Sequence, residues 1–256
     1  MIYSQDLNLN IKVEQVLEII KKLSSNDRYR SALIFGSIAR GEFVEESDID
    51  VKVIIKGSEH SEINHLTIQN IKFDITFHSL DSLIKDTRQE IKDGKKIPIV
   101  SESIILFDKD GMISQLIKYA NDKSKPLKYK ESKYNSIRFI ILNEDAKVTR
   151  HITKDPTTAN YIMHTGLEDI IKMFYKIKGK WTVSNKRTLK DLKMWDLKLY
   201  DIVSNLVNSN DLIKKYELWS QMIDYVLSFI GGGTNIVETS CTCERCKTDI
   251  NYLLSL

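Results

Sequence analysis

The sequence is poor in the residues that interrupt or cross-link a chain. Its 256 residues include only 10 glycines, 3 prolines and 3 cysteines, so neither long flexible linkers nor a disulfide-rich scaffold is expected. No apolar run approaches the 18 uninterrupted residues of a membrane-spanning helix. The first residues, MIYSQDLNLNIKVEQ, lack the basic and apolar regions of a signal peptide. These absences predict a cytoplasmic protein with no membrane partner.

The three cysteines crowd together near the end of the sequence. Cys241, Cys243 and Cys246 form a C-x-C-x-x-C pattern, which supplies three possible thiolate ligands for zinc. No histidine follows them to complete a four-ligand site, so a fourth ligand would have to come from elsewhere. Unpaired thiols on a loop are the favoured interpretation, with metal binding as the alternative.

Charge is distributed unevenly along the chain. Residues 121–200 contain 18 Lys and Arg against 9 Asp and Glu, whereas the whole chain has a net charge of only +3. The rest of the chain is therefore acidic. This division suits a cleft that holds a polyanion together with a divalent metal ion; the alternative is a lysine-rich helical surface exposed to water.

The first half of the chain alternates between strand and helix patterns. Apolar residues recur at helical spacing in 11–23, and Ser79 or Asp81 is a suitable cap for a helix through Ile91. Residues 71–77 alternate, with Phe73 and its apolar neighbours on one face and Asp74 on the other. Strands are predicted at 32–35, 49–55, 71–77 and 103–107, and a turn at 108–111 precedes another helix.

The second half consists of long amphipathic segments. Helices are predicted at 134–153, 158–178, 188–207 and 211–229. We place the boundary near residues 123–126. The expected fold is an α+β (α/β-type) N-terminal domain with a small mixed sheet, residues 1–125, followed by an all-α helical bundle, residues 126–256.

Carboxylates interrupt the apolar pattern of two predicted strands. Asp48 and Asp50 are two residues apart, so on a strand both point to the same face. Asp74 lies on a neighbouring strand and faces away from the apolar side. Carboxylates gathered on one face repel one another unless a hard cation compensates their charge. The pattern predicts a Mg²⁺ site, in which paired ions can stabilise both the attacking and the leaving oxygen of a phosphoryl displacement.

The Gly36-Ser37 turn follows the first predicted strand. A small turn at this point allows backbone N–H groups to approach a phosphate closely, and a helix beginning at Ser37 would add a favourable dipole. Arg40 lies within reach of a triphosphate oxygen. Gly36, Ser37 and Arg40 are therefore candidate phosphate ligands.

One pattern in the first half of the chain resembles the signature of the nucleotidyltransferase superfamily that includes DNA polymerase β. It consists of Gly-Ser, ten further residues and then Asp-Ile-Asp, between apolar runs. Phe73-Asp74-Ile75 resembles the strand that carries its third carboxylate. The order of domains is similar to that of the kanamycin and lincosamide nucleotidyltransferases. The resemblance implies transfer of a nucleoside monophosphate from an NTP, expected to be ATP, to a hydroxyl group, with two Mg²⁺ ions and release of pyrophosphate.

The resemblance also implies residue roles. By position, Asp48 and Asp50 would bind Mg²⁺, while Asp74 would bind the metal or act as the base. Ser37 and Arg40 would hold the β and γ phosphates. Relatives often share a site across a dimer, so a homodimer is compatible with the resemblance.

In the antibiotic-modifying relatives the first long helix of the second domain supplies a base and a phosphate-binding lysine. Lys147 matches that lysine by its spacing to the Pro-Thr-Thr sequence at 156–158, which puts Asn143 where the base should be. The base is then Glu144, Asp145 or Asp74. Lys186, in the segment GKWTVSNKR, is a further candidate nucleotide ligand.

Three functions agree with this pattern. The first is nucleotidyl transfer to a hydroxyl of a small, antibiotic-like molecule. The second is transfer to RNA, such as tRNA, or to protein as in toxin-type relatives; the basic block favours an RNA acceptor because Lys and Arg bind phosphate backbones. The third is a non-catalytic nucleotide sensor, which the presence of all three acids disfavours.

Overall fold

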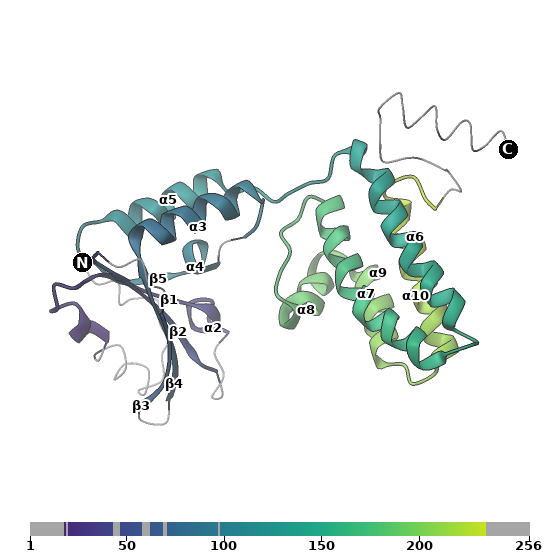
Figure 1. Ribbon diagram of the computed structural model, residues 1–256, viewed down its shortest axis with the longest axis horizontal. Coiled ribbons are helices and arrows are strands. Elements are labelled where there is room, and N and C mark those ends of the chain that lie inside the picture. Colours follow the sequence, from purple (N-terminus) through teal and green to yellow (C-terminus); the bar gives the residue numbers. More distant parts are fainter. Residues whose placement is uncertain are drawn as a thin grey trace. The chain divides into compact units, whose positions relative to one another are not determined.

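The computed structural model describes residue 18 and residues 20–42, 47–57, 62–68, 71–96 and 98–233. Contacts divide the chain into two compact units, Met1–Lys125 and Pro126–Leu256. The first unit is built on a sheet and the second on helices (Figure 1). No helix within the described ranges is long and apolar enough to cross a membrane.

The first unit contains a five-stranded mixed sheet with the strand order β3-β4-β2-β1-β5. Strands β2 and β4 pair in parallel, and the other pairs are antiparallel. Its elements are β1 (Tyr29–Phe35), α2 (Gly36–Ala39), β2 (Ile49–Ile55), β3 (Glu62–Ile68), β4 (Ile71–Ser79), α3 (Leu80–Lys92), α4 (Pro98–Ser101), β5 (Ile104–Asp108) and α5 (Met112–Lys123). The mixed sheet predicted from the sequence is confirmed.

Each face of the sheet carries its own apolar core. Alternate residues of β2, such as Val51 and Val53, pack with Phe73 on one face. The other face packs against α3 and α5, which lie side by side in Figure 1, through Ile54, Leu83 and further apolar side chains. A two-residue alternation therefore divides β2 between two cores. Asp50 belongs to the set that faces the α3 and α5 side.

Two elements of this unit were not predicted from the sequence. The edge strand β3 has the sequence EINHLTI, in which polar residues interrupt the apolar alternation typical of a strand. The short helix α4 follows the Lys-rich segment after α3. Of the helix predicted at 11–23, residues 18 and 20–23 are helical and the remainder lies outside the described residues. The predicted cap of α3 is Ser79, whose hydroxyl accepts a hydrogen bond from the Ser82 backbone N–H at 3.1 Å.

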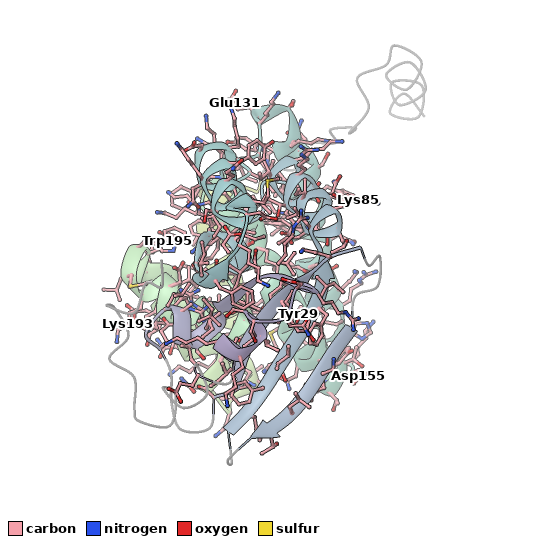
Figure 2. All side chains as sticks on the ribbon, turned by 90° about the vertical axis from the view of Figure 1, so that its left-hand side faces the viewer. Tyr29, Lys85, Glu131, Asp155, Lys193 and Trp195 are labelled. Carbon is pink, nitrogen blue, oxygen red and sulfur yellow. The ribbon has the colours of Figure 1, made fainter. Side chains whose placement is uncertain are left out.

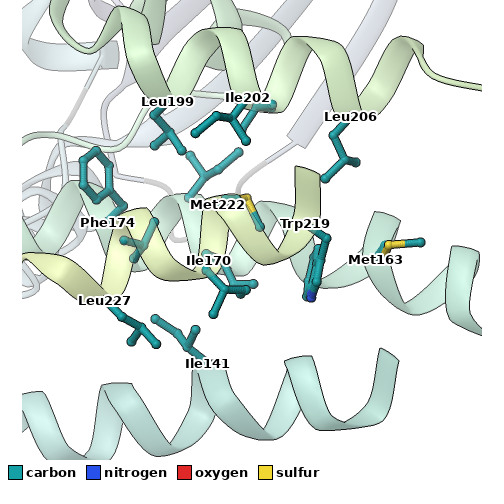
Figure 3. Close-up of a cluster of buried hydrophobic side chains, with 14 of the residues drawn as sticks. Ile141, Met163, Ile170, Phe174, Leu199, Ile202, Leu206, Trp219, Met222 and Leu227 are labelled. Atoms are coloured by element: carbon teal, nitrogen blue, oxygen red, sulfur yellow. The ribbon is translucent and has the colours of Figure 1, made fainter. Parts of the chain in front are cut away.

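The second unit is helical. Its elements are the 3-10 turn η1 (Glu131–Lys133) and the helices α6 (Tyr134–His151), α7 (Pro156–Ile177), α8 (Asn185–Trp195), α9 (Leu197–Asn208) and α10 (Leu212–Ser228). Buried side chains from α6, α7, α9 and α10 meet in one core, which includes Ile141, Phe174 and Trp219 (Figure 3). This unit is all-helical within the described residues, as the long amphipathic segments predicted.

The single helix predicted at 188–207 is wrong, because the segment forms two helices. Asp196 leaves the helical conformation, with φ −146° and ψ 75°. Its carboxylate accepts a hydrogen bond from the Leu199 backbone N–H at 3.0 Å and another from the Tyr225 hydroxyl at 3.0 Å. A capping aspartate ends α8 and begins α9, since its side chain satisfies donors that a helix start leaves open.

Candidate functional site

Asp50 and Asp74 lie directly opposite each other on the parallel strands β2 and β4. Both side chains point to the same face of the sheet, because paired residues in register share a face. Asp50 and Asp74 are each half-buried. The structure therefore brings two carboxylates side by side, as the alternation of the two sequence segments predicts.

Gly36 sits against the Asp50 carboxylate. Its φ is +78°, and a Cβ atom added there would lie 2.0 Å from Asp50 Oδ2. Phe35, the residue before it, is paired with Asp50 across the β1–β2 ladder. Only glycine fits both the left-handed backbone and this close approach. The turn after β1 and the carboxylate of β2 thus form one compact feature.

Asp48 precedes β2 and is exposed. Within the part of the chain that the structure describes, no group of three or more His, Cys, Asp or Glu side chains is arranged to hold a metal ion alone. Mg²⁺ commonly takes one or two carboxylates and completes its shell with water and substrate phosphates. Two adjacent carboxylates beside a small turn fit that pattern, so Asp50 and Asp74 are a suitable donor pair for a metal that arrives with a nucleotide.

His65 contacts the third predicted carboxylate. It lies opposite Asp74 on the antiparallel β3–β4 pair, and its Nδ1 is 2.6 Å from Asp74 Oδ1. The histidine ring is exposed, with 75% of its side-chain surface accessible. No role was predicted for any histidine, because their spacing in the sequence is not that of metal ligands, and strand β3 was not predicted either. Its register with Asp74 is a tertiary property of the sheet.

Lys52 lies on the same strand face, two residues after Asp50. Only 5% of its surface is exposed. Burial lowers the pKa of Lys52 to about 8, while the charges of Asp86 and Glu90 on α3 act in the opposite direction. The face is thus acidic at Asp50 and Asp74 and basic one step further along β2.

Arg40 forms ion pairs with two carboxylates in this structure. Its Nε is 2.9 Å from Glu42 Oε2, and its Nη1 is 3.4 Å from Glu102 Oε2. Lys96 also pairs with Glu102. Only 14% of the Arg40 side chain is accessible. These contacts use Nε and Nη1 of a guanidinium that has five N–H donors, so Arg40 retains N–H groups that can reach a phosphate oxygen.

Residues 17–112 match the family model described as "Polymerase beta, Nucleotidyltransferase". The match contains β1, the Gly36 turn, β2 and β4. Residues 17–112 are a nucleotidyltransferase domain of the polymerase β superfamily. This match supports nucleotidyl transfer as the activity of residues 17–112, and enzymes of this family generally use an NTP and a divalent metal ion.

One solved structure similar to this chain is the crystal structure of a nucleotidyltransferase-like protein from Exiguobacterium sibiricum 255-15. The similarity covers 84% of this chain and 74% of that chain, with a TM-score of 0.43 and 16% sequence identity. No curated protein matches the chain.

Beyond the nucleotidyltransferase domain, Asp145 is held by the core of the helical unit. The Trp219 indole N–H donates a hydrogen bond of 3.0 Å to Asp145 Oδ1. Burial raises the pKa of Asp145, the Trp219 hydrogen bond acts in the opposite direction, and the charge of Asp224 adds to the rise. A half-buried carboxylate with a raised pKa can serve as a proton acceptor, but here its tryptophan partner also gives it a packing role.

The other candidates on the helical unit lie nearer the surface. Lys147 pairs with Glu144 on the same turn of α6, and 40% of the lysine side chain is accessible. Asn143 is exposed, as is Lys186 in the first turn of α8. Figure 2 labels Lys193, further along α8. The predicted cysteine cluster at 241–246 lies outside the described residues.

We expect Asp145→Asn to keep the helical unit folded and to remove part of the pH dependence of its free energy of unfolding. A carboxyl group whose pKa is raised by folding binds protons more tightly in the folded state. The free energy of unfolding therefore falls as pH rises from about 3.9, the pKa of an unfolded aspartate, through the raised value. Asparagine still accepts the Trp219 hydrogen bond, so at pH 7 stability should be unchanged or higher by about 1 kcal/mol.

Urea unfolding at pH 4 and pH 7 measures this effect. Asp201→Asn on the exposed face of α9 is the matched control and should change stability by less than about 0.5 kcal/mol at either pH. A loss of more than about 1 kcal/mol at pH 7 in Asp145→Asn would show that the ionised carboxylate itself stabilises the helical unit.

Proposed function

We propose that this enzyme transfers a nucleoside monophosphate from an NTP, with ATP as the expected donor, to a hydroxyl group of a small molecule, in a Mg²⁺-dependent reaction that releases pyrophosphate. The observation that carries the proposal is the register of Asp50 opposite Asp74, with Gly36 packed against Asp50. This arrangement supports the proposal that the two carboxylates bind metal beside a turn that binds phosphate.

In this reaction the acceptor oxygen attacks the α-phosphorus, and the bond from that phosphorus to the bridging oxygen of pyrophosphate breaks. Bound Mg²⁺ would neutralise charge on the attacking and leaving oxygens. Asp48, Asp50 and Asp74 are the residues proposed to hold it. The turn at Gly36 and Ser37 is proposed to bind the β and γ phosphates through backbone N–H groups.

The proton of the acceptor hydroxyl needs a base within hydrogen-bond reach. Asp74 is our first choice because its Oδ1 is already oriented by His65 Nδ1 at 2.6 Å, which leaves Oδ2 for the metal or the hydroxyl. Asp145 and Glu144 are the alternatives on the helical unit. Glu144 is already paired with Lys147, and Asp145 with Trp219.

We assign residues 1–125 to catalysis and residues 126–256 to binding of the acceptor and the nucleotide. Lys147 and Lys186 are the proposed phosphate ligands of the helical unit. Both side chains reach solvent, which suits residues that meet a ligand. In the first unit, Arg40 is proposed to bind phosphate through the N–H groups that do not meet Glu42 or Glu102.

RNA is the second candidate acceptor, and the excess of Lys and Arg in residues 121–200 favours it. The basic surroundings disfavour a polycationic acceptor such as an aminoglycoside, since like charges repel. A less cationic hydroxylated molecule fits better.

The test is to incubate the enzyme and Mg²⁺ with each α-labelled NTP in turn, together with a panel of hydroxylated antibiotics and, separately, total tRNA. We expect label on a small molecule, and strongest from ATP. Label on tRNA would replace the small-molecule acceptor by RNA. Nucleotide binding without transfer to any acceptor would favour a sensor and contradict the proposal.

A further inference from the structure

A pocket of about 210 Å³ lies within the helical unit. Its walls come from α7, the segment joining α7 to α8, α8 itself and α9, which neighbour one another in Figure 1. An engineered apolar cavity of about 150 Å³ holds benzene, so this pocket has room for a substituted six-membered ring. None of the residues assigned to nucleotide binding lines it.

The pocket is mainly apolar. Its walls include Leu167, Ile171, Val183, Leu189, Val203 and Val207. Ile171 and Val203 are almost completely buried, whereas Leu189 is 37% exposed. The buried pair forms an inner wall and Leu189 belongs to the open side. Such a surface favours an apolar ligand body by about 25 cal/mol for each Å² removed from water.

Tyr175 also lines the pocket, but its hydroxyl group is already used. It donates a hydrogen bond of 2.6 Å to Asp191 Oδ2, and the Trp195 indole N–H donates to the same oxygen at 2.8 Å. Burial raises the pKa of Tyr175 well above its usual range. Tyr175 therefore presents its ring to the pocket and keeps its polar atom in an internal hydrogen-bond network.

Glu168 is the one acidic side chain among the residues lining the pocket. Lys172 pairs with Glu168 Oε1, and the Asn185 side-chain amide donates to Glu168 Oε2 at 2.7 Å. These hydrogen bonds lower the pKa of Glu168, and the one from Lys172 has the larger effect. Glu168 therefore stays ionised. A carboxylate only accepts hydrogen bonds and has lone pairs beyond those two, so it can accept one more from a ligand.

The charges around Glu168 determine which kind of ligand group can donate a hydrogen bond to it. Lys172 also lines the pocket and already balances the carboxylate. A cationic ligand would meet the charge of Lys172, whereas an anionic ligand would meet Glu168. A neutral hydroxyl group can donate to Glu168 without adding a charge.

We propose that the pocket lined by Ile171, Leu189 and Val203, with Glu168 at its polar side, binds an uncharged, largely apolar small molecule that carries a hydroxyl group. The ligand's apolar ring fills the pocket and its hydroxyl donates to Glu168. This inference goes beyond nucleotidyl transfer. Binding here does not require the proposed reaction, so it is measured without an NTP and fails or succeeds independently of it.

Three probes of nearly equal size test the ligand class. Cyclohexylmethanol carries the hydroxyl, cyclohexylmethylamine is cationic at pH 7, and cyclohexanecarboxylate is anionic. Each is titrated into the full-length protein with ¹³C-labelled Ile, Leu and Val methyl groups, and NMR shifts report the site. We expect shifts at Ile171, Leu189 and Val203, with the alcohol binding at least about 3-fold more tightly than either charged probe.

Two variants test the site itself. Leu189→Trp places a large ring at the open side and should weaken binding of the alcohol by about 10-fold or more, because it occupies the ligand's volume. Glu168→Gln loses the charge that accepts the hydroxyl hydrogen bond and should weaken binding by about 3- to 10-fold. Asp169→Asn, the exposed neighbour of Glu168 on α7, should leave it unchanged.

The outcomes are distinct. Tightest binding by the carboxylate would mean that Lys172 governs recognition, and tightest binding by the amine would mean that Glu168 acts as a charge; either result overturns the neutral ligand. Equal binding by the wild type and Leu189→Trp, or shifts confined to other methyl groups, would overturn the site. So would the absence of shifts with all three probes up to their solubility.

Discussion

Asp50→Asn is expected to reduce nucleotidyl transfer by about 10³-fold or more while the protein stays folded. The substitution keeps the size of the side chain and removes the charge that pairs with Mg²⁺, and metal stabilisation of a phosphoryl transition state amounts to several kcal/mol. Asp50 is half-buried against Gly36, so little repacking is needed. Release of labelled pyrophosphate measures the rate, and circular dichroism follows the fold.

Asp122→Asn, an exposed position on α5, is the matched control and should retain full activity. Asp74→Asn should show a loss like that of Asp50→Asn, because Asp74 is the opposite member of the pair. Near-normal transfer by both Asp50→Asn and Asp74→Asn would contradict the carboxylate mechanism, whatever acceptor the enzyme uses.

Gly36→Ala is expected to lower transfer by about 10²-fold and to destabilise the protein. Its Cβ would lie 2.0 Å from Asp50 Oδ2, so the carboxylate must move, and a displacement of about 1 Å at a catalytic group can cost 10²-fold in rate. The backbone adds its own cost of about 1–2 kcal/mol, because a residue with a Cβ disfavours positive φ.

Gly41→Ala separates these two effects. Gly41 also has positive φ, at +68°, but a Cβ there would meet nothing within 4 Å. It should show the backbone cost in thermal unfolding and keep most of the transfer activity. If both alanine variants lose activity equally, the close approach of Gly36 to Asp50 has no catalytic consequence.

Much of the first unit could be predicted from local patterns. The alternation at 71–77 placed Phe73 on one face and Asp74 on the other, and the sheet has that arrangement. Ser79 was one of two expected caps of α3 and is the residue that caps it. These features follow from period-two side-chain alternation and from side chains bonding to nearby backbone, both of which are local.

The errors occurred where local pattern and tertiary context disagree. Strand β3 is largely polar and extended, since it completes a ladder with β4 rather than filling a core. The segment around Asp196 has helical periodicity on both sides, yet the aspartate caps a new helix with help from the distant Tyr225. The Arg40 phosphate contact stays a prediction, but its pairing with Glu102, which is 62 residues away, could not be foreseen from local pattern.

The sequence by itself determined the chemistry of the candidate site, because Gly36, Asp50 and Asp74 stand at fixed positions on strands whose faces alternate. Only the tertiary structure decided which partners these groups have. His65 reaches Asp74 and Trp219 holds Asp145, and the pocket beside Glu168 forms where α7, α8 and α9 pack. These contacts depend on how strands pair and helices pack, and Trp219 and Asp145 are 74 residues apart, so no local periodicity encodes which residues will meet.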